Sequence, residues 1–89
     1  MRFTWDPRKA ASNRRKHSVT FDEATTVFDD DRALVQPDVA HEDRFLILGT
    51  SARARVLFVV YAEVEVDDVV RIISARKATA HEREAYEAG

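Results

Sequence analysis

The sequence predicts an α+β domain in which a small antiparallel β-sheet is flanked by helices, in the order β-α-α-β-β-β-β-α. Apolar residues between positions 21 and 28 recur at helical spacing, which favours helices in the first third of the chain. Residues 33–75 instead form short apolar runs separated by brief polar segments. Connections this short join antiparallel neighbours, because a parallel pair needs a crossover of about a dozen residues or more. The 89 residues are enough for one domain, spanning residues 1–89.

The N-terminal segment predicts a strand followed by a helix. Phe3 and Trp5 alternate with polar residues, which is the period of a short strand. Asp6 and Pro7 then form a helix start, because aspartate caps helix N-termini and proline suits the first helical position. We expect this helix to run to about Lys16 and, because it is poor in apolar residues, to lie at the surface.

A second helix is predicted from residue 20 onwards. Thr20 and Glu23 have the spacing of a capping box, in which each side chain accepts a backbone N–H of the other residue. The predicted buried stripe of this helix is Phe21, Ala24, Val27 and Phe28. The aspartates at 29–31 oppose the helix dipole and should end the helix.

Four short runs are predicted strands, at residues 33–35, 44–50, 55–62 and 69–75. The middle two flank a tight polar turn and predict a hairpin, which the acidic segment 63–68 joins to the last strand. A final short helix opens at Ala78 or Thr79. We expect the helices on one face of the sheet.

The register of the central hairpin decides which side chains the sheet exposes. With Leu48 placed opposite Leu57, Arg44 and Tyr61 lie side by side on a partly open face. The other face is uniformly apolar and belongs under the helices: Phe45, Ile47, Gly49, Val56, Phe58 and Val60. A shift of one residue would move one strand's side chains to the opposite face.

Charge is distributed in blocks, although the net charge is only −2. Residues 1–17 carry six lysines and arginines against Asp6, whereas residues 18–43 carry eight acids against Arg32. Such blocks create local fields that act on charged partners. The basic helix, residues 8–16, therefore predicts a track for phosphate groups, with an ordinary solvated surface as the alternative.

Several classes of protein are disfavoured. The chain has no cysteine for a disulfide or a thiolate, and its two glycines cannot form a glycine-rich phosphate loop. The three histidines, His17, His41 and His81, lack metal-ligand spacing, so we expect neither a metal nor another cofactor. No apolar run approaches the ~20 residues of a membrane span, and the N-terminus does not have the pattern of a signal peptide. We therefore expect a cytoplasmic protein that does not contact the membrane.

The chemically active side chains that remain suit a phosphodiester. Guanidinium groups bind phosphate through two hydrogen bonds, and a histidine can move a proton near neutral pH. RNA also supplies its own nucleophile, the 2′-hydroxyl, so that neither a metal nor a covalent residue is required. On the last strand, Arg71 and Arg76 are an odd number of positions apart, so a regular strand would point them to opposite faces. They can serve one site only if the strand bends or ends, and either can instead pair with nearby acids.

The chain resembles a known family in several blocks of sequence. These are "WDPRKAASNRRKH" at 5–17, Phe21, Ala24 and Phe28, "EDRF" at 42–45, Gly49, and "RIISARKATAHERE" at 71–84. Together they resemble the BrnT family of toxins, the ribonuclease half of bacterial type II toxin–antitoxin pairs, over nearly the whole chain. One departure is Ser18, since the family usually has glycine after the histidine, and another residue there would tighten or shift the turn that aims His17.

The resemblance implies a fold like that of the RelE-type toxins and a ribonuclease activity that blocks translation. It implies neutralisation by a cognate antitoxin of the BrnA type, which carries a DNA-binding part. The complex would then repress its own operon, so that the toxin meets operator DNA only through the antitoxin. We expect a dimer or a hetero-oligomer with the antitoxin.

Two functions remain open at this point. The first is a metal-independent endoribonuclease in which one of Arg44, Arg71 and Arg76 stabilises the developing charge, and His17 or Glu42 acts as base or acid. In this hypothesis the RNA phosphates bind Lys9, Arg14, Lys16 and Lys77. The alternative role of His17 is a cation that satisfies the last carbonyls of its helix. The second function is a non-enzymatic module that acts only within a DNA-binding repressor complex.

Overall fold

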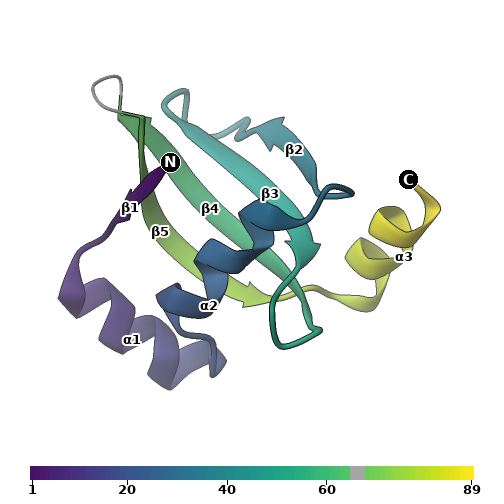
Figure 1. The fold of residues 1–89 in the computed structure, drawn as a ribbon, viewed down its shortest axis with the longest axis horizontal. Coiled ribbons are helices and arrows are strands. Elements are labelled where there is room, and N and C mark those ends of the chain that lie inside the picture. Colours follow the sequence, from purple (N-terminus) through teal and green to yellow (C-terminus); the bar gives the residue numbers. More distant parts are fainter. Residues whose placement is uncertain (65–67) are drawn as a thin grey trace.

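The molecule is built on a five-stranded sheet with the strand order β1-β5-β4-β3-β2 (Figure 1). The computed structural model describes residues 1–64 and 68–89. Its elements are β1 (Arg2–Thr4), α1 (Pro7–His17), α2 (Phe21–Thr25), the 3₁₀ helix η1 (Thr26–Asp29), β2 (Leu34–Pro37), β3 (Arg44–Thr50), β4 (Val56–Val64), β5 (Val69–Lys77) and α3 (Ala80–Ala88). The α+β class and the predicted order of elements are confirmed, with the second predicted helix divided into α2 and η1. The predicted acidic connection 63–68 lies partly outside the described residues.

The sheet is mixed, because β1 runs parallel to β5 whereas the other three strand pairs are antiparallel. The predicted antiparallel sheet rested on the short connections between β2, β3, β4 and β5, and these pairs are antiparallel. The rule about short connections does not apply to β1, because most of the chain separates it from β5. No short connection constrains the relative direction of these two strands.

The register of the β3–β4 hairpin is one residue away from the predicted one. Gly49 lies opposite Leu57, and Leu48 lies opposite Phe58. Tyr61 is consequently on the face covered by α1 and α2, where it is buried and its ring stacks on that of Phe45 at 5.6 Å. The expectation that Arg44 and Tyr61 lie side by side was therefore wrong, since a one-residue slip exchanges the faces of a whole strand.

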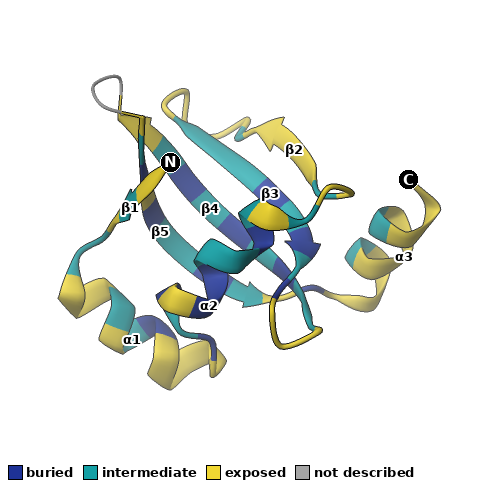
Figure 2. Cartoon of the chain, viewed as in Figure 1, coloured by how far each residue is buried: buried dark blue, intermediate teal, exposed yellow. Residues whose placement is uncertain are grey.

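The core lies between the sheet and α1, α2 and η1, on the face that we call the inner face. Figure 2 shows the buried residues concentrated on the central strands and on the side of α2 that faces them. The sheet contributes Ile47, Leu57, Val59, Tyr61, Val70, Ile72 and Ala75 to this core. The predicted stripe on the second helix is confirmed, because Phe21, Ala24 and Val27 are buried and Phe28 packs against them.

The predicted helix starts are found, but one of them is built differently. Asp6 accepts the N–H of Arg8, and Pro7 is the first residue of α1. At α2, Thr20 accepts the N–H of Glu23, which is half of the predicted capping box. The Glu23 carboxylate does not return to Thr20, because it binds the Arg55 guanidinium and the Ser51 hydroxyl in the turn between β3 and β4. This bond with Arg55 lowers the pKa of Glu23.

The C-terminal helix α3 packs over one end of the opposite face, which we call the outer face. Its start is a full capping box between Thr79 and Glu82. Near its end the Tyr86 hydroxyl binds Asp30 and lies 3.0 Å from the Thr50 hydroxyl oxygen. The expectation that all helices lie on one face was therefore wrong for α3. No helix in the described part of the chain is long and apolar enough to cross a membrane.

Candidate functional site

The outer face carries two of the predicted catalytic arginines in one row across the sheet. Arg44 on β3 and Arg71 on β5 are both paired with Ala62, which lies on β4 between them. Neighbouring strands are about 4.8 Å apart, so the backbones of the two arginines are about 10 Å apart, within the joint reach of two guanidinium groups. The outer face therefore presents two cations on adjoining positions of a rigid sheet.

A β-bulge brings Arg76 to this same face. Val60 pairs with Ser74 and Tyr61 pairs with Ile72, which leaves Ile73 as the extra residue of β5. The bulge changes the alternation, so Arg71 and Arg76 point to one side although five positions separate them. A regular strand would have placed them on opposite sides, and the sequence does not reveal where a bulge lies.

Arg76 is nevertheless not free to act as a simple phosphate ligand. Its guanidinium binds the two carboxylate oxygens of Glu82 at 2.7 and 2.9 Å and lies 4.1 Å from the ring centroid of Phe58. The hydrogen bonds from Arg76 are the main cause that lowers the pKa of Glu82 to about 2. These contacts anchor α3 to the end of the sheet, which is the structural alternative that the sequence left open for this residue.

Glu42 and Arg44 lie at the start of β3, in and just after the turn that follows β2. The residues of this turn next to Arg44, including Glu42, are exposed. Arg44 is partly buried, and its Nε atom has no hydrogen-bond partner among the described residues. Glu42 precedes Arg44 by two positions. It therefore lies next to the row that Arg44 forms with Arg71.

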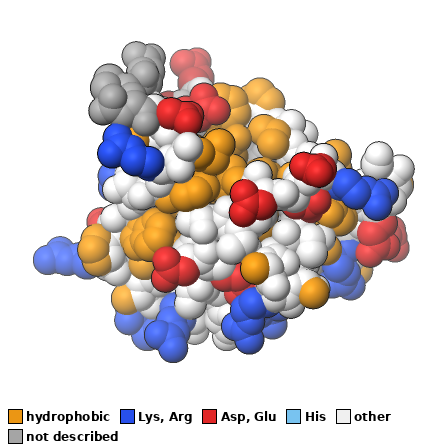
Figure 3. All heavy atoms as spheres, viewed as in Figure 1, with side chains coloured by type: hydrophobic (Ala, Val, Ile, Leu, Met, Phe, Trp, Pro, Cys, Tyr) orange, Lys and Arg blue, Asp and Glu red, His pale blue; other side chains and the backbone are white. Residues whose placement is uncertain are grey.

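His17 lies elsewhere, at the exposed C-terminal end of α1. Together with Lys9 and Lys16 it lines a shallow hollow between α1 and Ile73 and Ser74 of β5. Figure 3 shows Lys and Arg side chains along the lower left of the molecule, where α1 lies. His17 is therefore placed with predicted RNA-binding lysines and not in the row of Arg44 and Arg71.

The other predicted RNA-binding residues do not all face this hollow. Arg14 lines a different hollow, between α1 and α2, together with Trp5 and Phe21. Lys77 is exposed at the end of β5. The basic residues thus surround α1 and the end of β5 and do not form a single file.

Two residues near these sites were not predicted to matter. The buried Asn13 of α1 donates to the carbonyl of Ala75 and accepts its N–H. His81 lies on α3 against the outer face, beside Glu82 and near Phe58. Asn13 forms part of the sequence block at 5–17, which is the signal that could have drawn attention to it, whereas nothing in the sequence indicated the surroundings of His81.

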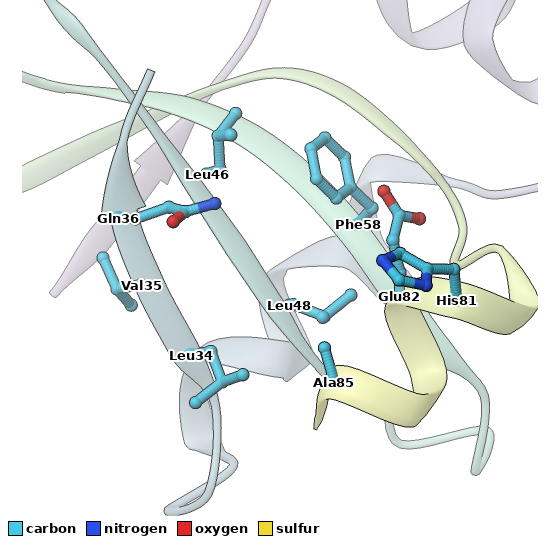
Figure 4. A pocket seen from close by; sticks show the side chains of 9 residues that line it. All are labelled: Leu34, Val35, Gln36, Leu46, Leu48, Phe58, His81, Glu82 and Ala85. Carbon is cyan, nitrogen blue, oxygen red and sulfur yellow. The ribbon is translucent and has the colours of Figure 1, made fainter. Parts of the chain in front are cut away.

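An apolar groove also opens on the outer face, between β2, β3 and α3 (Figure 4). It has a volume of about 250 Å³, with Leu46, Leu48 and Phe58 in the sheet and Ala85 on α3 among its lining residues. Within residues 1–64 and 68–89, no three His, Asp or Glu side chains lie close enough together to hold a metal ion.

A sequence profile of the BrnT family, described as the ribonuclease toxin BrnT of type II toxin–antitoxin systems, matches residues 5–82. The chain belongs to the BrnT family. The crystal structure of the Brucella abortus ribonuclease toxin BrnT is similar to it, with a TM-score of 0.73 and 25% sequence identity, over 89% of this chain and 97% of that one. No curated protein sequence matches significantly.

Membership of the BrnT family makes this chain a ribonuclease toxin of a type II toxin–antitoxin system, which implies an antitoxin as its partner. The predicted identity is therefore confirmed at the level of the family. The fold agrees, since the match with the Brucella BrnT toxin extends over most of both chains. The likeness to RelE-type toxins stays a prediction.

Proposed function

We propose that this BrnT-family toxin is a metal-independent endoribonuclease that inhibits translation by cleaving RNA, and that a BrnA-type antitoxin neutralises it. The observation that carries the proposal is the row formed by Arg44 and Arg71 on the outer face, with Glu42 in the adjoining turn. Two guanidinium groups held by a sheet suit a phosphodiester, because they can bind its non-bridging oxygens without reorganising during the reaction.

In the proposed reaction, the RNA 2′-hydroxyl oxygen forms a bond to the adjacent phosphorus while the bond to the 5′-oxygen breaks. Arg44 and Arg71 stabilise the negative charge that develops on the non-bridging oxygens. Glu42, an exposed carboxylate two positions before Arg44, accepts the proton of the 2′-hydroxyl, and the 5′-oxygen takes a proton from solvent. The products are a cyclic phosphate and a free 5′-hydroxyl, and the balance needs no oxidant or metal.

The basic surface of α1 supports a path for the RNA strand. The hollow with Lys9, Lys16 and His17 borders Ile73 and Ser74, and Ser74 follows Arg71 by three positions on β5. A strand that lies along α1 can therefore cross the edge of β5 toward Arg71. In this arrangement His17 binds a phosphate beside the reacting one, and Glu42 carries the proton transfer.

The decisive experiment incubates the purified chain with RNA in excess EDTA. We expect cleavage to continue, with 2′,3′-cyclic phosphate ends. The matched comparison is Glu42→Gln against Asp43→Asn, two neighbouring exposed acids of the same turn. Glu42→Gln should lower the cleavage rate at least about a hundredfold, the lower end of what a positioned general base contributes, while Asp43→Asn leaves it near the parent value.

Two results would contradict the proposal. Cleavage that is lost in EDTA and restored by one divalent ion rules out the metal-independent mechanism. A folded chain that leaves RNA intact under all conditions favours the non-enzymatic module within a repressor complex.

A further inference from the structure

Positive and negative charges gather at opposite edges of the sheet. On one side α1 carries five basic residues and no acid over residues 7–17. On the other side, residues 29–43, which contain β2 and its flanking turns, carry six acids and one arginine, and α3 carries three glutamates and one arginine. Figure 1 shows α1 at one end of the sheet and β2 and α3 at the other.

The acidic side also exposes apolar side chains. β2 is the edge strand of the sheet, and its Leu34 and Val35 are 40% and 54% exposed. Leu34 lies at the mouth of the apolar groove on the outer face, opposite Leu48 in the β2–β3 register (Figure 4). An uncovered edge strand with apolar residues is a place where another chain can add its backbone and side chains.

We infer that this groove and the free edge of β2 form the docking surface for an antitoxin segment that carries apolar side chains flanked by basic residues. We call the surface, made of β2, its flanking acidic turns and the groove beneath α3, the acidic docking surface. The inference rests on the antitoxin partner that the family implies and adds the place and the chemistry of its contact. An apolar side chain of the partner fills the groove, and its basic residues face the acidic turns.

Charge favours the antitoxin over RNA as the occupant of the groove. The acids around β2 repel phosphates, and Arg76, whose partners Glu82 and Phe58 line the groove, is already bound to the first and stacked on the second. A basic protein segment is attracted by the same field, which raises its association rate and makes binding sensitive to salt. RNA would thus lie along α1 and the row of Arg44 and Arg71, whereas the antitoxin would bind β2 and the groove.

The test uses the cognate antitoxin, purified and labelled, in titrations with variants of the full chain. Leu34→Lys puts a positive charge, of the same sign as the basic partner, at the mouth of the apolar groove. It should weaken antitoxin binding at least about tenfold. The matched control is Val64→Lys, the same kind of change at an apolar site of similar exposure, 42%, at the end of β4 and outside this surface, which should change binding less than about threefold. Circular dichroism establishes that both variants fold, and cleavage of RNA by the free variants is measured in parallel.

A second pair of substitutions tests the charge. Asp31→Asn with Asp43→Asn should weaken antitoxin binding and flatten its dependence on salt, because both carboxylates are exposed beside β2. Should the parent chain cleave no RNA, the proposed ribonuclease function fails, while the antitoxin titrations still decide the docking surface.

Two outcomes would overturn the inference. One is antitoxin binding at the parent affinity by folded Leu34→Lys. The other is a folded Leu34→Lys that loses RNA cleavage and keeps antitoxin binding, which would assign the groove to RNA.

Discussion

The side-chain amide of Asn13 binds the edge of β5 as a neighbouring strand would. Its Nδ2 atom donates to the carbonyl of Ala75 at 2.7 Å, its Oδ1 atom accepts the N–H of Ala75 at 3.0 Å, and the same Nδ2 donates to the carbonyl of Val19. Asn13 is 6% exposed, so these bonds are shielded from water. One side chain thus closes part of the free edge of β5, aligns α1 with the sheet and fixes the turn that leads into α2.

We expect Asn13→Asp to destabilise the fold by about 2–3 kcal/mol. The carboxylate can still accept the N–H of Ala75, but it cannot donate, so it leaves two buried carbonyls without a donor and faces them with a negative charge. Urea denaturation followed by circular dichroism measures the change. The control is Ser12→Ala at the adjacent position, which should stay within about 0.5 kcal/mol of the parent. An equally small effect of Asn13→Asp would show that the edge contact contributes little.

Ser18 occupies the left-handed position that ends α1, and we expect Ser18→Gly to stabilise the fold by about 0.5–1 kcal/mol. Its φ is 56° and its ψ is 33°, which costs energy for any residue with a Cβ atom. The backbone bonds of this position, to the Arg14 carbonyl and from Arg55 to the Ser18 carbonyl, need no side chain. Thermal unfolding measures the gain. A lower melting temperature for Ser18→Gly would mean that the greater flexibility of glycine in the unfolded chain outweighs the relief.

The Arg76–Glu82 pair should make the stability depend on pH in the acid range. The pKa of Glu82 is lowered to about 2 in the fold, so its contribution is fully present above the usual pKa of a glutamate and is lost as the pH falls toward 2. We expect Glu82→Gln to be less stable than the parent by about 1–2 kcal/mol at pH 7, with the difference shrinking below about pH 4.5. Urea denaturation at several pH values measures it. A difference that stays constant from pH 7 to pH 2.5 would contradict this assignment.

Arginine substitutions separate chemistry from anchoring on the outer face. Arg44→Ala and Arg71→Ala should each lower the rate of RNA cleavage by about two to three decades, the usual loss for a preorganised charge at the reacting phosphate. For Arg76, Glu82→Gln is the matched variant, because it breaks the same ion pair and keeps the arginine. If Arg76 acts only as an anchor of α3, Arg76→Ala and Glu82→Gln lower cleavage and stability to a similar extent. A much larger loss of cleavage in Arg76→Ala would assign it to the reacting phosphate.

The lysines of the α1 hollow should control RNA affinity and its response to salt. Removing Lys9 and Lys16 together should weaken binding of single-stranded RNA, and each lost phosphate contact should lower the slope of log affinity against log salt by about 0.7. Fluorescence titrations at several salt concentrations measure both quantities. Arg83→Ala removes one positive charge from α3 on the other side of the molecule and should leave the slope unchanged. Equal effects on the two sides would indicate a response to net charge alone.

The local elements could be predicted from the sequence. The helix start at Asp6 and Pro7, the apolar stripe of the second helix and the bounds of β3 follow from short-range preferences, which act between residues a few positions apart. The blocks of charge and the family resemblance were also visible in the sequence. These features are enough to predict an α+β ribonuclease toxin with a basic first helix.

Only the tertiary structure decided how those elements meet. The hairpin register moved Tyr61 under the helices, the bulge at Ile73 turned Arg71 and Arg76 to one face, and β1 joined β5 in parallel. The Glu23 carboxylate binds Arg55 and not its predicted capping partner. Asn13 binds the backbone of Ala75, which is 62 positions away in the sequence. Each of these depends on which distant groups the fold brings together to fill the core and to pair buried polar atoms. Local preferences carry no information about such partners, so the row of Arg44 and Arg71 could be seen only once the sheet was complete.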